Sequence, residues 1–157
     1  MRPLRTYRCS SLSVKGMDTL VCTATMFIIP INIAAVRGKY VLMNVYLGLT
    51  LTSWAHHGIS HELSRLGRTK CVTTYNRIDL AMCYAALAYT FVYSLMYTNR
   101  LQWILYCMCF VFDVYHYYMY VNTNPFYYVR GLENWNLHKS HIIIHLSTCV
   151  GFTAIAL

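Results

Sequence analysis

Five long runs of apolar residues, separated by short polar segments, organise this sequence. Each run has roughly the 17 to 25 residues that a helix needs to cross the hydrocarbon core of a membrane. A chain of 157 residues cannot cover five such helices with polar partners. The pattern predicts an all-α, polytopic membrane helix bundle, with a single domain over 1–157 that begins with a short basic tail at 1–19. The expected spans are 20–36, 40–57, 78–97, 101–121 and 138–157.

The first run has a second interpretation as a signal peptide, because basic residues precede it. The run is long for the apolar part of a signal peptide, and Arg37-Gly38-Lys39 joins it to the next run as a tight hairpin. We therefore expect a transmembrane helix, bent at Pro30.

The basic residues divide unequally between the two sides of this bundle. Only 11% of the residues are charged and 57% are hydrophobic, which is typical of a membrane protein. The N-terminal tail, the loops 58–77 and 122–137, and Lys139 hold ten of the 13 Lys and Arg residues on one side. The other side holds three: Arg37, Lys39 and Arg100. Because basic residues concentrate on the cytosolic side, we expect a cytosolic N-terminus, and the net charge of +8 then reflects topology rather than a nucleic-acid partner.

Histidines gather at the predicted cytosolic end of the spans. All seven lie there or in the loop after the second span: His56, His57, His61, His116, His138, His141 and His145. His141 and His145 are four residues apart, as are Ser53 and His57, so each pair lies on one helical face. The two helices run in opposite directions and meet at the same level, so one metal ion can contact His57, His141 and His145. Three imidazoles with room for a water are the ligand set of a catalytic zinc.

Two carboxylates lie at the same depth. Asp79 opens the third span, and Asp113 lies in the last part of the fourth, three residues before His116. Ionisable groups at membrane depth are costly unless they are paired or bind a metal, so this convergence indicates a site.

Structural interpretations of these residues stay open beside the functional one. Ser53 can bond to the carbonyl one turn earlier, and Asp79 can cap its helix. Asp113 and His116 can pair with each other or support a zinc-binding histidine. For three histidines we favour a position among the lipid headgroups: His56, His61 and His138.

These residues resemble the motif of one superfamily of membrane proteins. The sequence Ser53-Trp54-Ala55-His56-His57, together with Asp79 and the His-x-x-x-His of 141–145, is similar to the pattern of the alkaline ceramidase, adipoQ receptor and GPI-remodelling hydrolase superfamily. The Ser-Trp-x-x-His motif and the run 145–151 look closest to alkaline ceramidases. The resemblance implies a zinc-dependent hydrolase of a lipid amide bond, which splits ceramide into a sphingoid base and a fatty acid. Members usually have seven spans, so a partner subunit or a second copy of the chain is a candidate for completing the bundle.

The resemblance also implies a role for each residue. Zinc held by His57, His141 and His145 lowers the pKa of a water to roughly 7. Asp79 orients that water and moves its proton, and Ser53 stabilises the oxyanion with a hydrogen bond.

Two other functions fit part of the pattern. Membrane desaturases and hydroxylases bind two irons through histidine-rich boxes, but this chain has a single adjacent pair, and Ser53 and Asp79 would go unexplained. A non-catalytic receptor-like protein or scaffold would keep a metal for stability alone.

Overall fold

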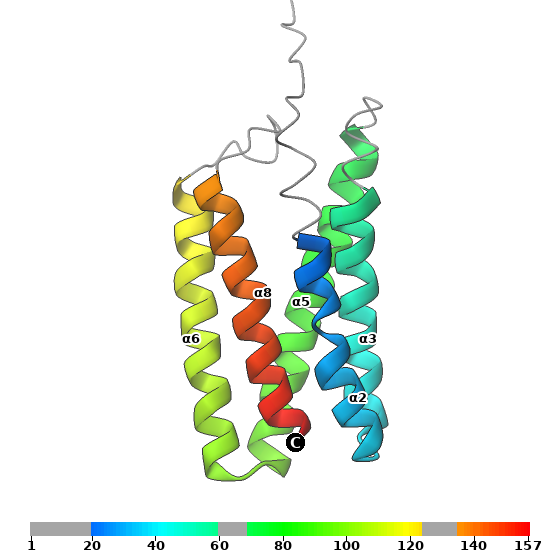
Figure 1. Cartoon of the computed structure of the whole chain (residues 1–157), viewed down its shortest axis with the longest axis vertical. Helices are drawn as coiled ribbons and strands as arrows, with labels where there is room; N and C mark the ends of the chain where they lie inside the picture. Colours follow the sequence, from blue (N-terminus) through cyan, green and yellow to red (C-terminus); the bar gives the residue numbers. More distant parts are fainter. Residues whose placement is uncertain (1–19, 60–68, 124–134) are drawn as a thin grey trace, which may run out of the picture.

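The computed structural model describes residues 20–59, 69–123 and 135–157, and its elements are helical throughout (Figure 1). No strand occurs within these ranges, which confirms the predicted all-α class. The first helix, Leu20–Val36, contains α2 as its second part. The elements are α2 (Ile28–Val36), α3 (Tyr40–Trp54), the π-helix η1 (Ala55–Ile59), α5 (Thr69–Tyr97), α6 (Arg100–Thr123) and α8 (Trp135–Ala156).

The helices differ in how well they suit a membrane. In the described part of the chain, Thr74–Tyr97 is the one helix that is both long and apolar enough to cross a membrane, and the apolar helix Leu20–Val36 is shorter. The structure therefore confirms a bundle of helices, of which one is a candidate membrane span by length and composition.

The hairpin between α2 and α3 turns on Gly38. This residue has a φ of +70°, in the left-handed region that glycine adopts without strain. Lys39 N donates to Ala34 O over 2.8 Å and Gly38 N donates to Ala35 O over 3.0 Å, which is the Schellman pattern at a helix end. The tight hairpin predicted at 37–39 is confirmed.

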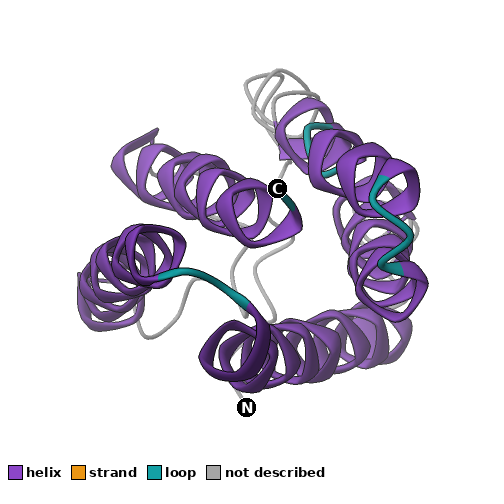
Figure 2. Ribbon diagram, turned by 90° about the horizontal axis from the view of Figure 1, so that it is seen from below, coloured by secondary structure: helices purple, strands orange, loops and turns teal. Residues whose placement is uncertain are grey.

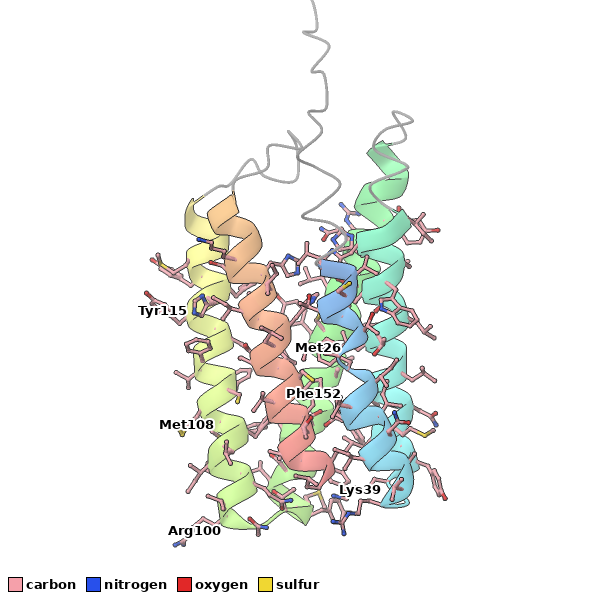
Figure 3. All side chains as sticks on the ribbon, in the orientation of Figure 1. Met26, Lys39, Arg100, Met108, Tyr115 and Phe152 are labelled. Carbon is pink, nitrogen blue, oxygen red and sulfur yellow. The ribbon has the colours of Figure 1, made fainter. Side chains whose placement is uncertain are left out.

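Lys39 connects this hairpin to the end of α8. Its Nζ donates to Ile155 O over 3.0 Å, so a cation meets the unpaired carbonyls of a helix C-terminus. Burial lowers the pKa of Lys39, and the charge of Arg37 lowers it further. Lys39 and Arg100 lie at the same end of the bundle (Figure 3).

A reciprocal cap makes the turn between α5 and α6. Asn99 Oδ1 accepts from Gln102 N over 3.0 Å, and Gln102 Oε1 accepts from Asn99 N over 3.2 Å. This is the capping-box arrangement, in which the side chains three residues apart satisfy two exposed backbone donors. The turn is therefore short, and α5 and α6 run antiparallel.

The first helix is interrupted at Met26 and Phe27, one turn before Pro30. Pro30 has no N–H to donate to Met26 O. Ile29 N bonds this carbonyl instead over 3.0 Å, and the Cys149 thiol of α8 donates to it over 3.3 Å. The expected bend is confirmed, and a neighbouring helix satisfies the carbonyl that the proline leaves without its helical donor.

Packing divides the bundle into two groups of helices. The helix α6 lies against α8, and α3 lies between α2 and α5, whereas α5 scarcely touches α6 or α8. Figure 2 shows α5 crossing below α8 from α6 toward α3. The two groups meet in an aromatic core, where Tyr46 of α3 stacks on Phe152 of α8 with ring centroids 4.4 Å apart. A space between α5, α6 and α8 is left for the site.

The third helix begins earlier than predicted. α5 starts at Thr69, nine residues before the expected start at 78, because the polar segment 69–77 contains neither proline nor glycine to stop the helix. Asp79 therefore lies ten residues inside α5. The interpretation of Asp79 as a helix cap is wrong.

Two glycines offer a test of this packing. A Cβ on Gly151 would lie 3.1 Å from Cys109 Cβ, next to the backbone of α6, whereas a Cβ on Gly48 would meet only the flexible end of Met82 at 2.9 Å. Both alanine substitutions gain the same helix propensity, so their difference isolates packing. We expect Gly151→Ala to be less stable than Gly48→Ala by about 1 to 3 kcal/mol in denaturation of the detergent-purified protein. Equal stabilities would contradict the close approach of α6 and α8.

Candidate functional site

Three histidines from two helices meet inside the bundle. His141 and His145 lie one turn apart on α8, and His57 lies in η1, at the end of α3. The ring centroid of His57 is 4.8 Å from that of His141 and 5.3 Å from that of His145. One nitrogen from each ring lies within 4.8 Å of the others. The predicted convergence of these three residues is present in the fold.

The turn that carries His57 is a π-helix, which the sequence analysis did not predict. A π-turn holds more residues than the 3.6 of an α-helix, so consecutive side chains are separated by a smaller angle. His56 and His57 are consequently both buried, with ring centroids 4.7 Å apart. The expectation that His56 sits among the headgroups is wrong, because His56 lies inside the bundle.

The donor set suits a transition metal ion. Three imidazoles are typical ligands of zinc and also suit copper, iron and nickel. His57 and His145 are buried and His141 is half-buried, so the ligand atoms lie away from bulk water. The residues fit a bound metal ion, and their chemistry does not single out zinc.

Thr23 orients one of these rings, and the sequence analysis missed it. Its hydroxyl donates to Leu20 O over 3.0 Å, so its oxygen accepts from Nδ1 of His145, also 3.0 Å away. Nδ1 then carries the ring proton, and Nε2 keeps the lone pair that a metal needs. Thr23 and His145 are 122 residues apart in the sequence, so no local pattern connects them.

Asp79 belongs to a second group of ligands at the same site. One carboxylate oxygen of Asp79 and one nitrogen each of His56 and His57 lie within 4.8 Å of one another. Thr52 Oγ1 of α3 lies 3.4 Å from Asp79 Oδ1, and its shorter hydrogen bond is to Leu49 O over 3.0 Å. Asp79 is 8% exposed, so the structure brings this predicted site residue to the histidines from inside α5.

A cavity of about 540 Å³ opens beside these residues. Its polar lining near the histidines comes from Ser53, His56, Asn76, Asp79, His141 and His145. On every helix the lining becomes apolar farther along, as with Leu87 and Phe91 on α5 and Phe152 on α8. Along α5 the lining runs from Asn76 to Phe91, about 22 Å of helix. The cavity is long and large enough for an apolar chain. Its lining is polar at one end and mainly apolar along the rest.

Ser53 lies at the polar end of this cavity and is 2% exposed. His57 is outside the cavity lining, so the cavity meets the ligand set through His141 and His145. The hydroxyl of Ser53, the carboxylate of Asp79 and two metal-binding rings therefore border one space.

Asp113 and His116 have different surroundings from those predicted. Asp113 accepts hydrogen bonds from the hydroxyls of Ser147 and Thr148 of α8. Nδ1 of His116 is buried without a hydrogen-bond partner, and its ring packs against Phe112 with centroids 4.5 Å apart. The bonds of Asp113 are thus to α8 hydroxyls rather than to His116, and Asp113 lines the cavity.

Two predicted positions lie outside the described residues or side chains: His61 and His138.

No protein-family model, no curated protein and no solved structure matches this chain. The resemblance to the ceramidase superfamily therefore rests on the sequence motif alone.

The Thr23 contact yields a prediction about metal affinity. Thr23→Val removes the acceptor of His145 Nδ1 while preserving side-chain volume, and we expect about 10- to 100-fold weaker metal binding. Thr25→Val is a matched control, because Thr25 is exposed and bonds only back to Val21 O over 2.8 Å. Metal retained against a chelator series, measured by inductively coupled plasma mass spectrometry, gives the comparison. The His141→Ala/His145→Ala variant sets the level without a site, and equal retention by the two threonine variants would refute the role of Thr23.

Proposed function

We propose that this chain is an integral membrane, metal-dependent hydrolase of a lipid amide bond, similar to alkaline ceramidases, with zinc as its metal. The observation that carries the proposal is that Ser53, Asp79, His141 and His145 line the polar end of a long apolar cavity, with His57 next to the two α8 histidines. An apolar chain suits the deep part of this cavity, and a carbonyl group suits its polar end.

The surface of the bundle supports a multi-pass membrane protein. Large apolar side chains cover the outer face of α6, where Leu101, Met108 and Val111 are each at least 67% exposed. Met108 and Tyr115 project away from the other helices (Figure 3). Soluble monomers rarely expose continuous apolar surfaces of this kind. We propose that all five helices are embedded, with the N-terminus and the site on the cytosolic side.

Each residue of the site has a chemical task in this proposal. His57, His141 and His145 would hold the metal ion, which supplies Lewis acidity and activates water when bound. Asp79 accepts the proton of the attacking water and delivers it to the amide nitrogen as the carbon–nitrogen bond breaks. The Ser53 hydroxyl donates a hydrogen bond to the carbonyl oxygen, whose negative charge grows in the transition state. The products are a fatty acid and an amine.

The apolar part of the cavity also limits where water can bind near the substrate. Beyond the polar end most of the cavity lining on α5, α6 and α8 is apolar, so few groups there can hold a water molecule. A hydrogen bond from Ser53 is stronger there than in water because the surroundings are less polar.

Substitution of Ser53 tests the catalytic proposal against a structural metal site. Ser53→Ala should keep the metal and lower kcat about 10²- to 10³-fold for ceramide, because one oxyanion donor is lost. Ser94→Ala is the matched control, since Ser94 is also buried but bonds to Phe91 O over 2.7 Å and lies outside the cavity lining. Metal content and ceramide hydrolysis are measured on the same preparations.

The alternatives give different results in these measurements. One zinc per chain without turnover of any lipid amide would indicate a receptor-like protein or scaffold. Two irons per chain would indicate a desaturase or hydroxylase. Either result would overturn the proposed hydrolase.

The proposed topology predicts opposite locations for the two ends of the chain. Five crossings place an N-terminal epitope tag in the cytosol and a C-terminal tag across the membrane. In sealed microsomes an added protease should remove the N-terminal tag and leave the C-terminal tag intact. Removal of both tags would show an even number of crossings.

A further inference from the structure

Asp113 is a buried carboxylate that the proposed chemistry does not use. Its side chain is 7% exposed and borders the cavity beside Thr148 of α8. Ser147 Oγ donates to Asp113 Oδ1, and Thr148 Oγ1 donates to Oδ2 over 2.7 Å. In the part of the chain that the structure describes, both of these bonded partners are neutral hydroxyls. The carboxylate is therefore fixed in position while its charge is not neutralised by them.

The register of α8 relates Asp113 to the metal-binding rings. Thr148 follows His145 by three residues and His141 by seven, so the three side chains share one helical face. With a rise of 1.5 Å per residue, Thr148 lies about 4.5 Å farther along the axis than His145. Asp113 is hydrogen-bonded to Thr148. The carboxylate thus lies about one helical turn deeper in the cavity than His145.

The chemistry of Asp113 defines what it can recognise. An ionised carboxylate only accepts hydrogen bonds, and each oxygen can accept about two. The bonds from Ser147 and Thr148 use one site on each oxygen, so further acceptor sites are left beside the cavity. On α6, Phe110 and Val114 beside Asp113 offer no donor, and Tyr117, which also lines the cavity, lies about one helical turn farther along the helix. A ligand that brings a donor to this depth gains a charge-assisted hydrogen bond in apolar surroundings.

We propose that Asp113 is a specificity-determining residue that accepts a hydrogen bond from a hydroxyl group next to the amide of the substrate. The inference rests on the proposed function, because it assumes that the amide carbonyl lies at the histidines. About four covalent bonds separate the carbonyl carbon of an N-acyl amino alcohol from its nearest hydroxyl oxygen, and they span roughly the 4 to 5 Å of one helical turn. Asp113 thus favours amides with a hydroxyl group about four bonds from the carbonyl carbon over fatty amides that lack one.

A structural role for Asp113 predicts something different. If the carboxylate only fastens α6 to α8, its substitution should alter stability and affect all lipids alike. Asparagine has nearly the same volume and can still bond to Ser147 and Thr148, so Asp113→Asn should fold. It removes the negative charge and half of the acceptor capacity.

The test compares two lipids that have identical chains. One is the N-acyl amide of a long-chain amino alcohol, and the other is the amide of the same amine without hydroxyl groups. Their affinities are measured by displacement of a fluorescent fatty amide from the metal-loaded Ser53→Ala protein, so no turnover is needed. With Asp113 intact, we expect at least about 10-fold tighter binding of the hydroxylated lipid. Asp113→Asn should abolish that preference while leaving the affinity for the lipid without hydroxyls unchanged.

A matched variant separates recognition from helix fastening. Ser147→Ala removes one hydroxyl from the contact but keeps the carboxylate, so it should lower thermal stability and preserve the preference. Equal affinity of the protein for the two lipids would overturn the inference even if Asp113→Asn did not fold. A proportional loss for both lipids in Asp113→Asn would overturn it too. Preference without hydrolysis by the otherwise unchanged protein would refute the proposed function and leave the role of Asp113 standing.

Discussion

The contact between His57 and the two histidines of α8 is the feature on which the rest of the structure depends. It joins the helices on the α3 side of the bundle to the pair α6 and α8 at the polar end of the cavity, inside a bundle whose core is mainly apolar. Polar groups are costly in such surroundings unless they have partners or ligands. The same constraint accounts for Thr23 beneath His145, Thr52 beside Asp79, and the hydroxyls around Asp113. These polar residues form short groups around one cavity, in which hydroxyls of neighbouring helices contact His145, Asp79 and Asp113.

The helices were largely predictable because their signals are local. Long apolar runs gave the five helices, and Arg37-Gly38-Lys39 gave the first hairpin. The convergence of the three histidines followed from spacing on two antiparallel helices. The early start of α5 was missed because polar residues without a breaker continue a helix beyond its apolar run. Asp79 was consequently predicted correctly to lie near the histidines, but wrongly to lie at the start of its helix.

The remaining features depend on contacts between distant parts of the chain. The π-turn at η1 has no signature in residues 55–59, and it places His56 inside rather than among headgroups. Nothing near Thr23 in the sequence indicates that it meets His145. The partners of Asp113 lie on α8, so a search on its own helix face found only His116. Sequence periodicity identifies which face of a helix is polar, whereas the packing of helices decides which polar groups meet.

The bond between Thr23 and His145 has a consequence for the order in which the protein matures. The chain is synthesised from its N-terminus, so His57 is made long before the two histidines of the last helix. Metal binding by the full ligand set must therefore wait until α8 has been made and has joined the first helix. A chain interrupted before α8 would leave Thr23, His57 and Asp113 without their partners on that helix. If the three histidines hold a metal as proposed, metal binding would mark completed assembly of the bundle.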